Sequence, residues 1–398
     1  MLTSSHFNQN NMQKVILVIF ISSLFMSCRK SQRPEAAIFI DLDSGRESKL
    51  SEFFEELEYL LLDVPDSIPL VKVWKFDMST DKIFVSDREL NNVLIFDAFG
   101  QFKNIIKATG QGPNEFQSME DYQIFDDHIY VLDGSLRKIL KFDFEGKVKD
   151  EIRIEFHPYN FFINESGILY YFGNRPSFEY QSVVSVKNGS IDGLKEIQKD
   201  LEGLNYSSVY GFQYDIYDRN VLLKLDTSYE VLIFDEQLNK ERELKFDFGR
   251  YNFPDEKRKE FFMGYERYAY LMENQMIEMI FSFIPLKSHY LMIVNQTGKP
   301  AKTIFIDKKL DDIEVIDKMI NDMDGFQGNF SPVFQKNGNL IQVKGSRNFY
   351  NEYLENFSGK SIDSALIRDP KSIHHFFNKH KEKLKGDHYV IIKNRIKE

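Results

Sequence analysis

The sequence predicts an all-β fold, a six-bladed β-propeller with small helical insertions. Two observations predict it. Aromatic residues make up 15% of the 398 residues, and aromatic and β-branched residues favour strands. Short apolar runs bounded by turn residues also recur along the chain, two of them as copies 46 positions apart. Repeats of about 40 to 50 residues, each holding several short strands, are typical of propeller blades.

The repeat is clearest between residues 82–100 and residues 128–146. In each stretch a run of the type Ile-aromatic-Val-x-Asp is followed by a run that ends in Phe-Asp-x-x-Gly. The equivalent pairs, all 46 positions apart, are Ile83 and Ile129, Asp87 and Asp133, Phe96 and Phe142, Asp97 and Asp143, and Gly100 and Gly146. Each unit therefore predicts two strands. A turn closes the second strand, with Asp accepting backbone hydrogen bonds and Gly adopting the left-handed conformation.

The pattern continues along the chain with more drift. Strands are expected at residues 57–62, 70–76, 167–172, 183–189, 221–225, 231–235, 289–294 and 339–343. Six blades fit the length better than seven once two insertions are allowed for. Residues 37–40 are expected to pair with a final strand at residues 388–392 and so close the ring.

Two segments show apolar residues at helical spacing, three or four positions apart, and a third segment is a further helical candidate. They are residues 255–281, residues 307–324 and residues 371–385. The second holds Leu310, Ile313, Ile316 and Ile320. The first two are interpreted as amphipathic helices packed on the propeller, not as separate domains.

The amino-terminal region has the pattern of a secretory signal. Residues 15–26 are apolar, Lys14 precedes them and Ser27 follows. Twelve residues are too few to cross a bilayer as a helix, which needs about 20. A basic start, a short apolar stretch and a small residue at the cut predict a signal peptide over residues 1–27. Met1 and Met12 are both candidate starts.

Cys28 is the single cysteine of the chain and directly follows the predicted cut. The Ser-Cys pair resembles the lipobox of bacterial lipoproteins, which implies lipid attachment at Cys28. The alternatives are an ordinary cleaved signal with an incidental cysteine, or a buried apolar segment. Residues 28–35 are then a polar tether, and residues 36–398 are the predicted propeller.

A glycine-rich motif at residues 110–116 carries a family resemblance. The chain resembles the six-bladed β-propeller family of bacterial lipoproteins, which is distantly similar to NHL-repeat propellers. In that family a Gly-x-Gly-Pro-x-Glu-aromatic motif links one blade to the next. Its residues here are Gly110, Gly112, Pro113, Glu115 and Phe116. The resemblance implies the fold, export and lipidation, and implies little about activity.

Local motifs for catalysis or metal binding are weak. The glycine-rich motif lacks the Gly-Lys-Ser/Thr ending of a phosphate loop and carries Glu115 where phosphate needs a base, so a structural turn is the better interpretation. Asp322 and Asp324 form a candidate loop site, but the later Glu of a calcium loop is missing. No His-Glu-x-x-His or Gly-x-Ser-x-Gly motif occurs. The sequence therefore predicts no catalytic residue, metal or cofactor.

Aromatic clusters offer another kind of site. Residues 159–162, 206–217 and 349–350 are suited to stacking on sugars or peptide side chains, although packing between blades is the favoured interpretation. The formal charge of −10 disfavours a nucleic-acid partner.

We expect a membrane-anchored binding or interaction module that presents a protein-, peptide- or glycan-binding propeller face in the cell envelope, facing the periplasm. Its expected partners are the membrane, through the lipid anchor, and an envelope protein, peptide or glycan. One alternative is a propeller enzyme, a hydrolase or lyase, with carboxylates from several blades meeting at the axis. Another is a structural subunit of an envelope complex.

Overall fold

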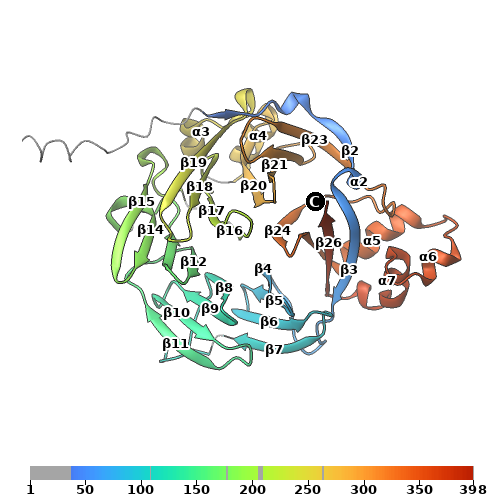
Figure 1. Ribbon diagram of the computed structural model, residues 1–398, viewed down its shortest axis with the longest axis horizontal. Helices are drawn as coiled ribbons and strands as arrows, with labels where there is room; N and C mark the ends of the chain where they lie inside the picture. Colours follow the sequence, from blue (N-terminus) through green and yellow to red (C-terminus); the bar gives the residue numbers. More distant parts are fainter. Residues whose placement is uncertain (1–36, 108, 176–177, 205–208, 262–263, 398) are drawn as a thin grey trace, which may run out of the picture. The chain divides into compact units, whose positions relative to one another are not determined.

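The computed structural model describes residues 37–397 except 108, 176–177, 205–208 and 262–263. These residues belong to one compact unit, Ala37–Glu398. Six sheets are arranged in a ring around a common centre (Figure 1). The predicted all-β propeller fold is therefore confirmed. The predicted signal peptide and tether, with Cys28, lie outside the described residues.

The first three sheets are antiparallel meanders whose strands follow chain order. The first contains β4 (Val73–Met78), β5 (Lys82–Asp87), β6 (Asn92–Asp97) and β7 (Phe102–Lys107). The second contains β8 (Asp121–Phe125), β9 (His128–Asp133), β10 (Lys138–Phe142) and β11 (Val148–Arg153). The third contains β12 (Asn160–Asn164), β13 (Gly167–Tyr171), β14 (Gln181–Lys187) and β15 (Ser190–Glu196).

The other three sheets each include one strand from the beginning of the described chain. The fourth contains β16 (Phe212–Asp215), β17 (Asn220–Lys224), β18 (Glu230–Phe234), β19 (Lys240–Asp247) and β1 (Ile38–Phe39). The fifth contains β20 (Ile277–Pro285), β21 (His289–Gln296), β22 (Lys302–Asp307), β23 (Ile313–Ile320) and β2 (Arg46–Lys49). The sixth contains β24 (Pro332–Lys336), β25 (Asn339–Gly345), β26 (Tyr389–Ile396) and β3 (Phe54–Leu62).

The sixth sheet joins the two ends of the described chain and closes the ring. β3 is antiparallel to β26 along almost its whole length, with Tyr59 opposite Ile392. The expectation that residues 37–40 pair with the last strand is wrong, because β1 instead runs parallel to β19. The longer β3 offers β26 many more backbone partners than the two residues of β1, and its Leu57 and Leu61 are buried.

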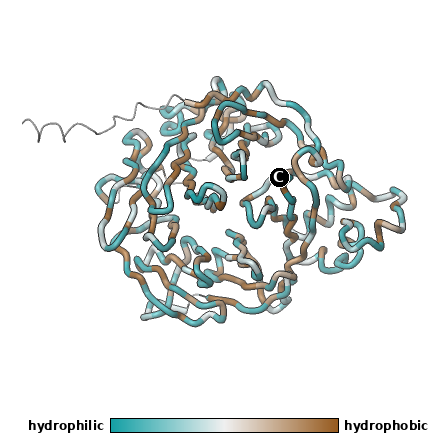
Figure 2. The backbone as a smooth tube through the Cα atoms, in the orientation of Figure 1, coloured by the Kyte–Doolittle hydropathy of each residue, from teal (hydrophilic) through white to brown (hydrophobic). Residues whose placement is uncertain are grey.

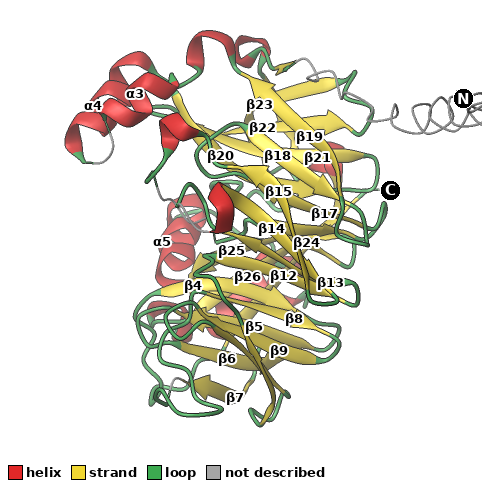
Figure 3. Cartoon of the chain, turned by 90° about the vertical axis from the view of Figure 1, so that its left-hand side faces the viewer, coloured by secondary structure: helices red, strands yellow, loops and turns green. Residues whose placement is uncertain are grey.

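Helices occupy the connections between strands. They are α2 (Leu50–Phe53), α3 (Asp255–Glu260), α4 (Tyr265–Asn274), α5 (Ser346–Phe357), α6 (Ser364–Arg368) and α7 (Ile373–His380), with short 3-10 turns at η1 (Leu42–Ser44), η2 (Phe178–Tyr180), η3 (Lys199–Leu201), η4 (Gly249–Tyr251) and η5 (Lys383–Lys385). Figure 3 shows α3, α4 and α5 projecting from the same side of the ring. The helices predicted within residues 255–281 and 371–385 are present as α3, α4 and α7. The sequence did not predict α5 and α6.

The predicted helix at residues 307–324 is wrong. This segment forms β23, which pairs with β22 on one side and with β2 on the other. Both edges of β23 thus find backbone partners in the sheet, and Val315 and Ile316 are buried there. The spacing of its apolar residues is compatible with a helix, but β22 and β2 were available to pair with both edges of the segment, which places it in the sheet.

The apolar core is divided among the interfaces between neighbouring sheets. One cluster joins Phe84 and Ile95 of the first sheet to Val131 and Leu140 of the second. Figure 2 shows apolar residues distributed around the whole ring and not gathered in one central mass.

The two repeated aspartates hold the loops that lead into the first and second sheets. Asp87 Oδ2 accepts hydrogen bonds from the backbone amides of Val71 and Lys72, at 2.6 and 2.9 Å. Asp133 Oδ2 accepts the equivalent bonds from Gln117 and Ser118, at 2.7 and 3.2 Å. Both aspartates are fully buried. A buried carboxylate is stable there because it accepts several backbone hydrogen bonds, which explains why the repeat retains it.

Candidate functional site

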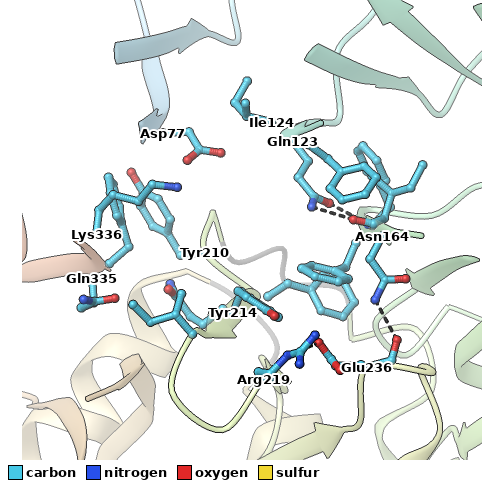
Figure 4. A pocket seen from close by; sticks show the side chains of 18 of the residues that line it. Asp77, Gln123, Ile124, Asn164, Tyr210, Tyr214, Arg219, Glu236, Gln335 and Lys336 are labelled. Carbon is cyan, nitrogen blue, oxygen red and sulfur yellow. Dashed lines mark hydrogen bonds and ion pairs between the residues drawn. The ribbon is translucent and has the colours of Figure 1, made fainter. Parts of the chain in front are cut away.

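A pocket of about 520 Å³ lies on the axis of the ring. Its walls come from β4, β8, β12, β16 and β24, the innermost strands of five of the six sheets. The turns that follow β12, β16 and β18 add residues at the rim. Residues far apart in sequence thus converge on one depression, which is where propeller folds can build a binding site. We call this depression the axial pocket (Figure 4).

Two amide side chains hold neighbouring strands in place at the axial pocket. Gln123 of β8 donates from Nε2 to the Ile163 carbonyl at 3.0 Å and accepts from the Ile163 amide at 2.7 Å. Asn164 donates from Nδ2 to the Glu236 carbonyl at 3.0 Å and accepts from the Ser166 amide at 2.9 Å. These side chains act as extra backbone partners, so they fix the spacing between sheets at the pocket wall.

One side of the pocket is aromatic. The rings of Phe162 and Tyr214 are nearly parallel, 22° apart, with centroids separated by 6.1 Å. Phe212 contacts the same Phe162 ring, also with a centroid distance of 6.1 Å. Phe162 is buried, whereas Tyr214 is 41% exposed. A buried ring therefore supports an exposed one, which leaves a flat apolar surface open to a ligand.

The other side is polar. Figure 4 places Asp77, Gln335 and Lys336 together on this side, across the pocket from Asn164. Burial raises the pKa of the Asp77 carboxyl, an effect opposed by the nearby charges of Lys336 and Lys75. Asp77 Oδ1 accepts a hydrogen bond from the Met78 amide at 2.7 Å.

The side chain of Gln335, on the polar side, has an incomplete set of hydrogen bonds. Its buried Nε2 has no hydrogen-bond partner among the described residues. A buried donor without a partner costs about 1–3 kcal/mol, so this side chain is not satisfied by the protein alone.

Charged residues in the pocket are balanced. Three basic side chains (Lys75, Arg219 and Lys336) and three acidic ones (Asp77, Glu165 and Glu236) line it. Arg219 Nε lies 2.5 Å from Glu236 Oε1 at the rim, and Lys75 Nζ lies 2.9 Å from Asp121 Oδ1 in the wall. Within the described ranges, no group of three or more His, Cys, Asp or Glu is placed to hold a metal ion.

The glycine-rich motif lies apart from the pocket, in the connection between β7 and β8. Glu115 Oε2 accepts a hydrogen bond from the Gly112 amide at 3.0 Å, and the Gly110 amide donates to the Phe116 carbonyl at 3.3 Å. A Cβ added to Gly110 or Gly112 would lie 2.6 or 2.9 Å from that carboxylate oxygen. The glycines therefore leave room for Glu115 inside its own turn. Pro113 lies in the same turn.

The candidate loop site after β23 contacts the beginning of the described chain. Asp322 accepts hydrogen bonds from the Ser51 amide at 3.0 Å and the Ser51 hydroxyl at 2.6 Å. Asp324 accepts from the Tyr59 hydroxyl at 2.6 Å, and burial raises its pKa. Neither aspartate lines the axial pocket.

The sequence analysis singled out some residues of the axial pocket without assigning them to a common site. The aromatic clusters at residues 159–162 and 206–217 contribute Phe161, Phe162, Tyr210, Phe212 and Tyr214 to its lining. The third cluster does not, because Phe349 and Tyr350 of α5 pack on Phe376 and Phe377 of α7.

Asp77, Gln335 and Lys336 were missed. A signal existed for one of them: Asp77 lies 46 positions before Gln123, the same offset as the repeat. Applying the offset of 46 to the innermost strands would have placed both Asp77 and Gln123 at the axis.

The ring of sheets and the axial pocket define a β-propeller protein. Residues 37–374 match the family model of a domain of unknown function, DUF4934, so the chain belongs to this family. No curated protein matches the chain in sequence. Among the residues that the structure describes, no helix is long and apolar enough to cross a membrane.

Several solved structures are similar in fold. A protein described as exported, from Bacteroides fragilis NCTC 9343, has a TM-score of 0.65 at 14% identity, over 91% of this chain and 100% of that chain. A DUF4221 family member from Bacteroides vulgatus ATCC 8482 has a TM-score of 0.45 at 11% identity, over 86% and 97%. Virginiamycin B lyase from Staphylococcus aureus with quinupristin has a TM-score of 0.41 at 12% identity, over 70% and 78%. At 14% identity the similarity to the Bacteroides fragilis protein shows the fold alone.

Proposed function

We propose that this protein is an exported, lipid-anchored binding module of the cell envelope whose axial pocket holds its ligand. The observation that carries the proposal is the composition of the pocket. An exposed aromatic surface on Tyr214 faces a polar side that contains Asp77 and the Gln335 Nε2, which has no hydrogen-bond partner among the described residues. Binding sites commonly combine apolar walls with a few convergent polar groups.

Two energetic features support a ligand in this pocket. An unsatisfied donor at Gln335 and a part-buried carboxyl at Asp77 both cost the free protein stability. Perturbed ionisable groups are enriched at functional sites. A ligand that supplies hydrogen-bond partners to this side of the pocket would offset both costs.

Site-specific photocrosslinking tests the pocket. A benzophenone amino acid replaces Ile216 at the pocket rim, or Leu366 on α6 as the matched control, since these side chains are 49% and 45% exposed. In native membranes we expect a discrete adduct from position 216 and none from position 366. Equal capture at both positions, or none at 216, would contradict a ligand site at the axis.

The anchor is tested by fractionation. We expect the wild-type protein in the membrane fraction and the Cys28→Ala form released from it, because lipid attachment requires that thiol. A periplasmic position also predicts resistance to protease in intact cells. Cleavage of the wild-type protein in intact cells would instead place it on the cell surface.

A second candidate function, a hydrolase or lyase, is favoured by one observation, the raised pKa of Asp77 in the pocket. A carboxyl with a raised pKa can act as a proton donor. The molecule captured at position 216 decides between the two. Recovery of a chemically altered ligand from wild-type protein but of the intact ligand from Asp77→Asn would support the enzyme, and an intact ligand from both would support binding alone.

A further inference from the structure

We propose that the ligand of the axial pocket is a neutral carbohydrate. This inference rests on the function proposed above and names the class of ligand that the pocket would hold. Three features of the lining carry it: the balance of charge, the exposed aromatic face and the abundance of side-chain amides.

The balance of charge argues for a neutral ligand. The three basic and three acidic lining residues cancel formally. Arg219 pairs with Glu236 within this set, whereas Lys75 pairs with Asp121, which does not line the pocket, so the lining has no surplus of positive charge. Lys336 offsets the charge of Asp77 on the polar side. A charged ligand would have to be desolvated without a surplus of opposite charge, which is unfavourable.

The aromatic side fits a sugar ring. Tyr214 is 41% exposed and lies over the buried ring of Phe162 at an interplanar angle of 22°. One face of a pyranose carries mainly C–H groups, so it is apolar and flat, whereas its hydroxyls point outward from the edge. Stacking on Tyr214 would bury the apolar face and direct the hydroxyls toward the polar side of the pocket.

The amide side chains around the pocket fit hydroxyl groups. Five lining side chains are amides: Gln123, Asn164, Gln213, Gln237 and Gln335. An amide offers both donors and an acceptor, which matches a hydroxyl that donates and accepts. Three of these amides already bond to neighbouring strands and turns, those of Gln123, Asn164 and Gln213. The Gln335 Nε2 makes no hydrogen bond with the described residues, so no such bond has to break when this side chain turns toward a sugar hydroxyl.

The test uses the full-length lipid-anchored protein in detergent micelles. Probes are a panel of neutral oligosaccharides, a panel of acidic oligosaccharides and a library of unmodified peptides, with hits measured by calorimetry. We expect a neutral oligosaccharide to bind. We expect Tyr214→Ala to weaken binding by about tenfold and Tyr214→Phe by less than about threefold, because Phe retains the stacking face.

Two further variants complete the design. Gln335→Leu keeps a similar volume but removes the amide, so we expect a loss of about fivefold. Tyr265→Ala removes a ring that is 83% exposed on α4, outside the pocket, and should leave binding unchanged. Thermal unfolding of every variant shows whether a loss of binding reflects a loss of fold.

The outcomes separate the ligand class from the function of the pocket. Binding of acidic oligosaccharides or peptides in place of neutral sugars, with capture retained at position 216, overturns the carbohydrate and leaves the binding module standing. A neutral sugar could instead bind with an affinity that neither Tyr214→Ala nor Gln335→Leu weakens. That result would show that the sugar does not bind in the axial pocket. Failure of every probe together with absence of capture at position 216 overturns the function of the pocket itself.

Discussion

Gly100 and Gly146 occupy equivalent positions in the repeat but differ in their surroundings. Both have positive φ, +78° and +84°. A Cβ at Gly100 would lie 2.1 Å from the Leu61 carbonyl oxygen, whereas at Gly146 the nearest atom is Asn104 Nδ2 at 3.3 Å. We expect Gly146→Ala to lower the free energy of unfolding by about 1 kcal/mol, the cost of the left-handed conformation. Gly100→Ala should cost about 3 kcal/mol or more, because a backbone atom must also move.

Urea denaturation of the two variants measures this difference. Gly146→Ala serves as the control for conformational strain alone. Gly146 lies in the same kind of turn as Gly100 but has no backbone atom close to the position of the added Cβ. Equal losses in both variants would show that the Leu61 carbonyl moves aside at little cost. The repeat in the sequence predicted both glycines and their turns. It could not predict the contact with Leu61, because β3 joins the ring from outside the repeat.

At the scale of elements, an ion-pair network links β15 to β18 and β19. Glu243 of β19 accepts hydrogen bonds from Lys195 of β15 at 2.7 Å and from Lys240 at 3.0 Å. Lys195 Nζ also lies 2.9 Å from Glu230 Oε2 of β18. Burial raises the pKa of Glu243, but the two lysines outweigh this effect and lower it to about 2. The network therefore stabilises the interface between the third and fourth sheets while Glu243 is ionised.

Glu243→Gln should show this contribution through its pH dependence. Because the pKa is lower in the folded state than the ordinary value of 4.5, the contribution is fully present above pH 4.5 and is lost as the pH falls toward 2. At pH 7 we expect Glu243→Gln to lower the free energy of unfolding by about 1–2 kcal/mol, after allowance for solvent screening. Denaturant titrations of both proteins between pH 7 and pH 3 give the difference at each pH.

The control for this titration is Glu241→Gln, an exposed neighbour on the same strand that forms no ion pair with the described residues. It should track the wild-type protein at every pH. A Glu243→Gln deficit that stays constant down to pH 3 would contradict the assigned ionisation.

The segment that forms β23 was predicted as a helix, and it shows why the local spacing of apolar residues is insufficient to assign secondary structure. The apolar residues of β23 repeat every three or four positions, as in a helix, but β2 pairs with this strand from about 270 positions earlier in the chain. The local sequence does not indicate hydrogen bonds to a strand that is so distant in the chain. By contrast, α7 was predicted correctly, because its buried face is set by its own residues Ile373, Phe376 and Phe377.

At the scale of the whole molecule, the sequence predicted a composite site at the axis but not most of its residues. Asp77 of β4 and Lys336 of β24 are separated by most of the chain. Their proximity follows from the closure of the ring, which joins the first and sixth sheets as neighbours around the centre (Figure 1). The axial pocket therefore forms only when the ring is closed, and its geometry depends on the sixth sheet, which closes the ring.

Truncation of the last strand tests that dependence. A chain that ends at Asp387 lacks β26, which lies between β25 and β3 in the sixth sheet. Its loss removes a partner from both neighbours at once and leaves two unpaired strand edges. We expect this chain to lose its cooperative thermal transition and to aggregate, whereas a chain that ends at Ile396 keeps β26 and should unfold cooperatively. Circular dichroism melting and size-exclusion chromatography distinguish the two. A cooperative transition in the shorter chain would mean that the other five sheets hold the ring without closure.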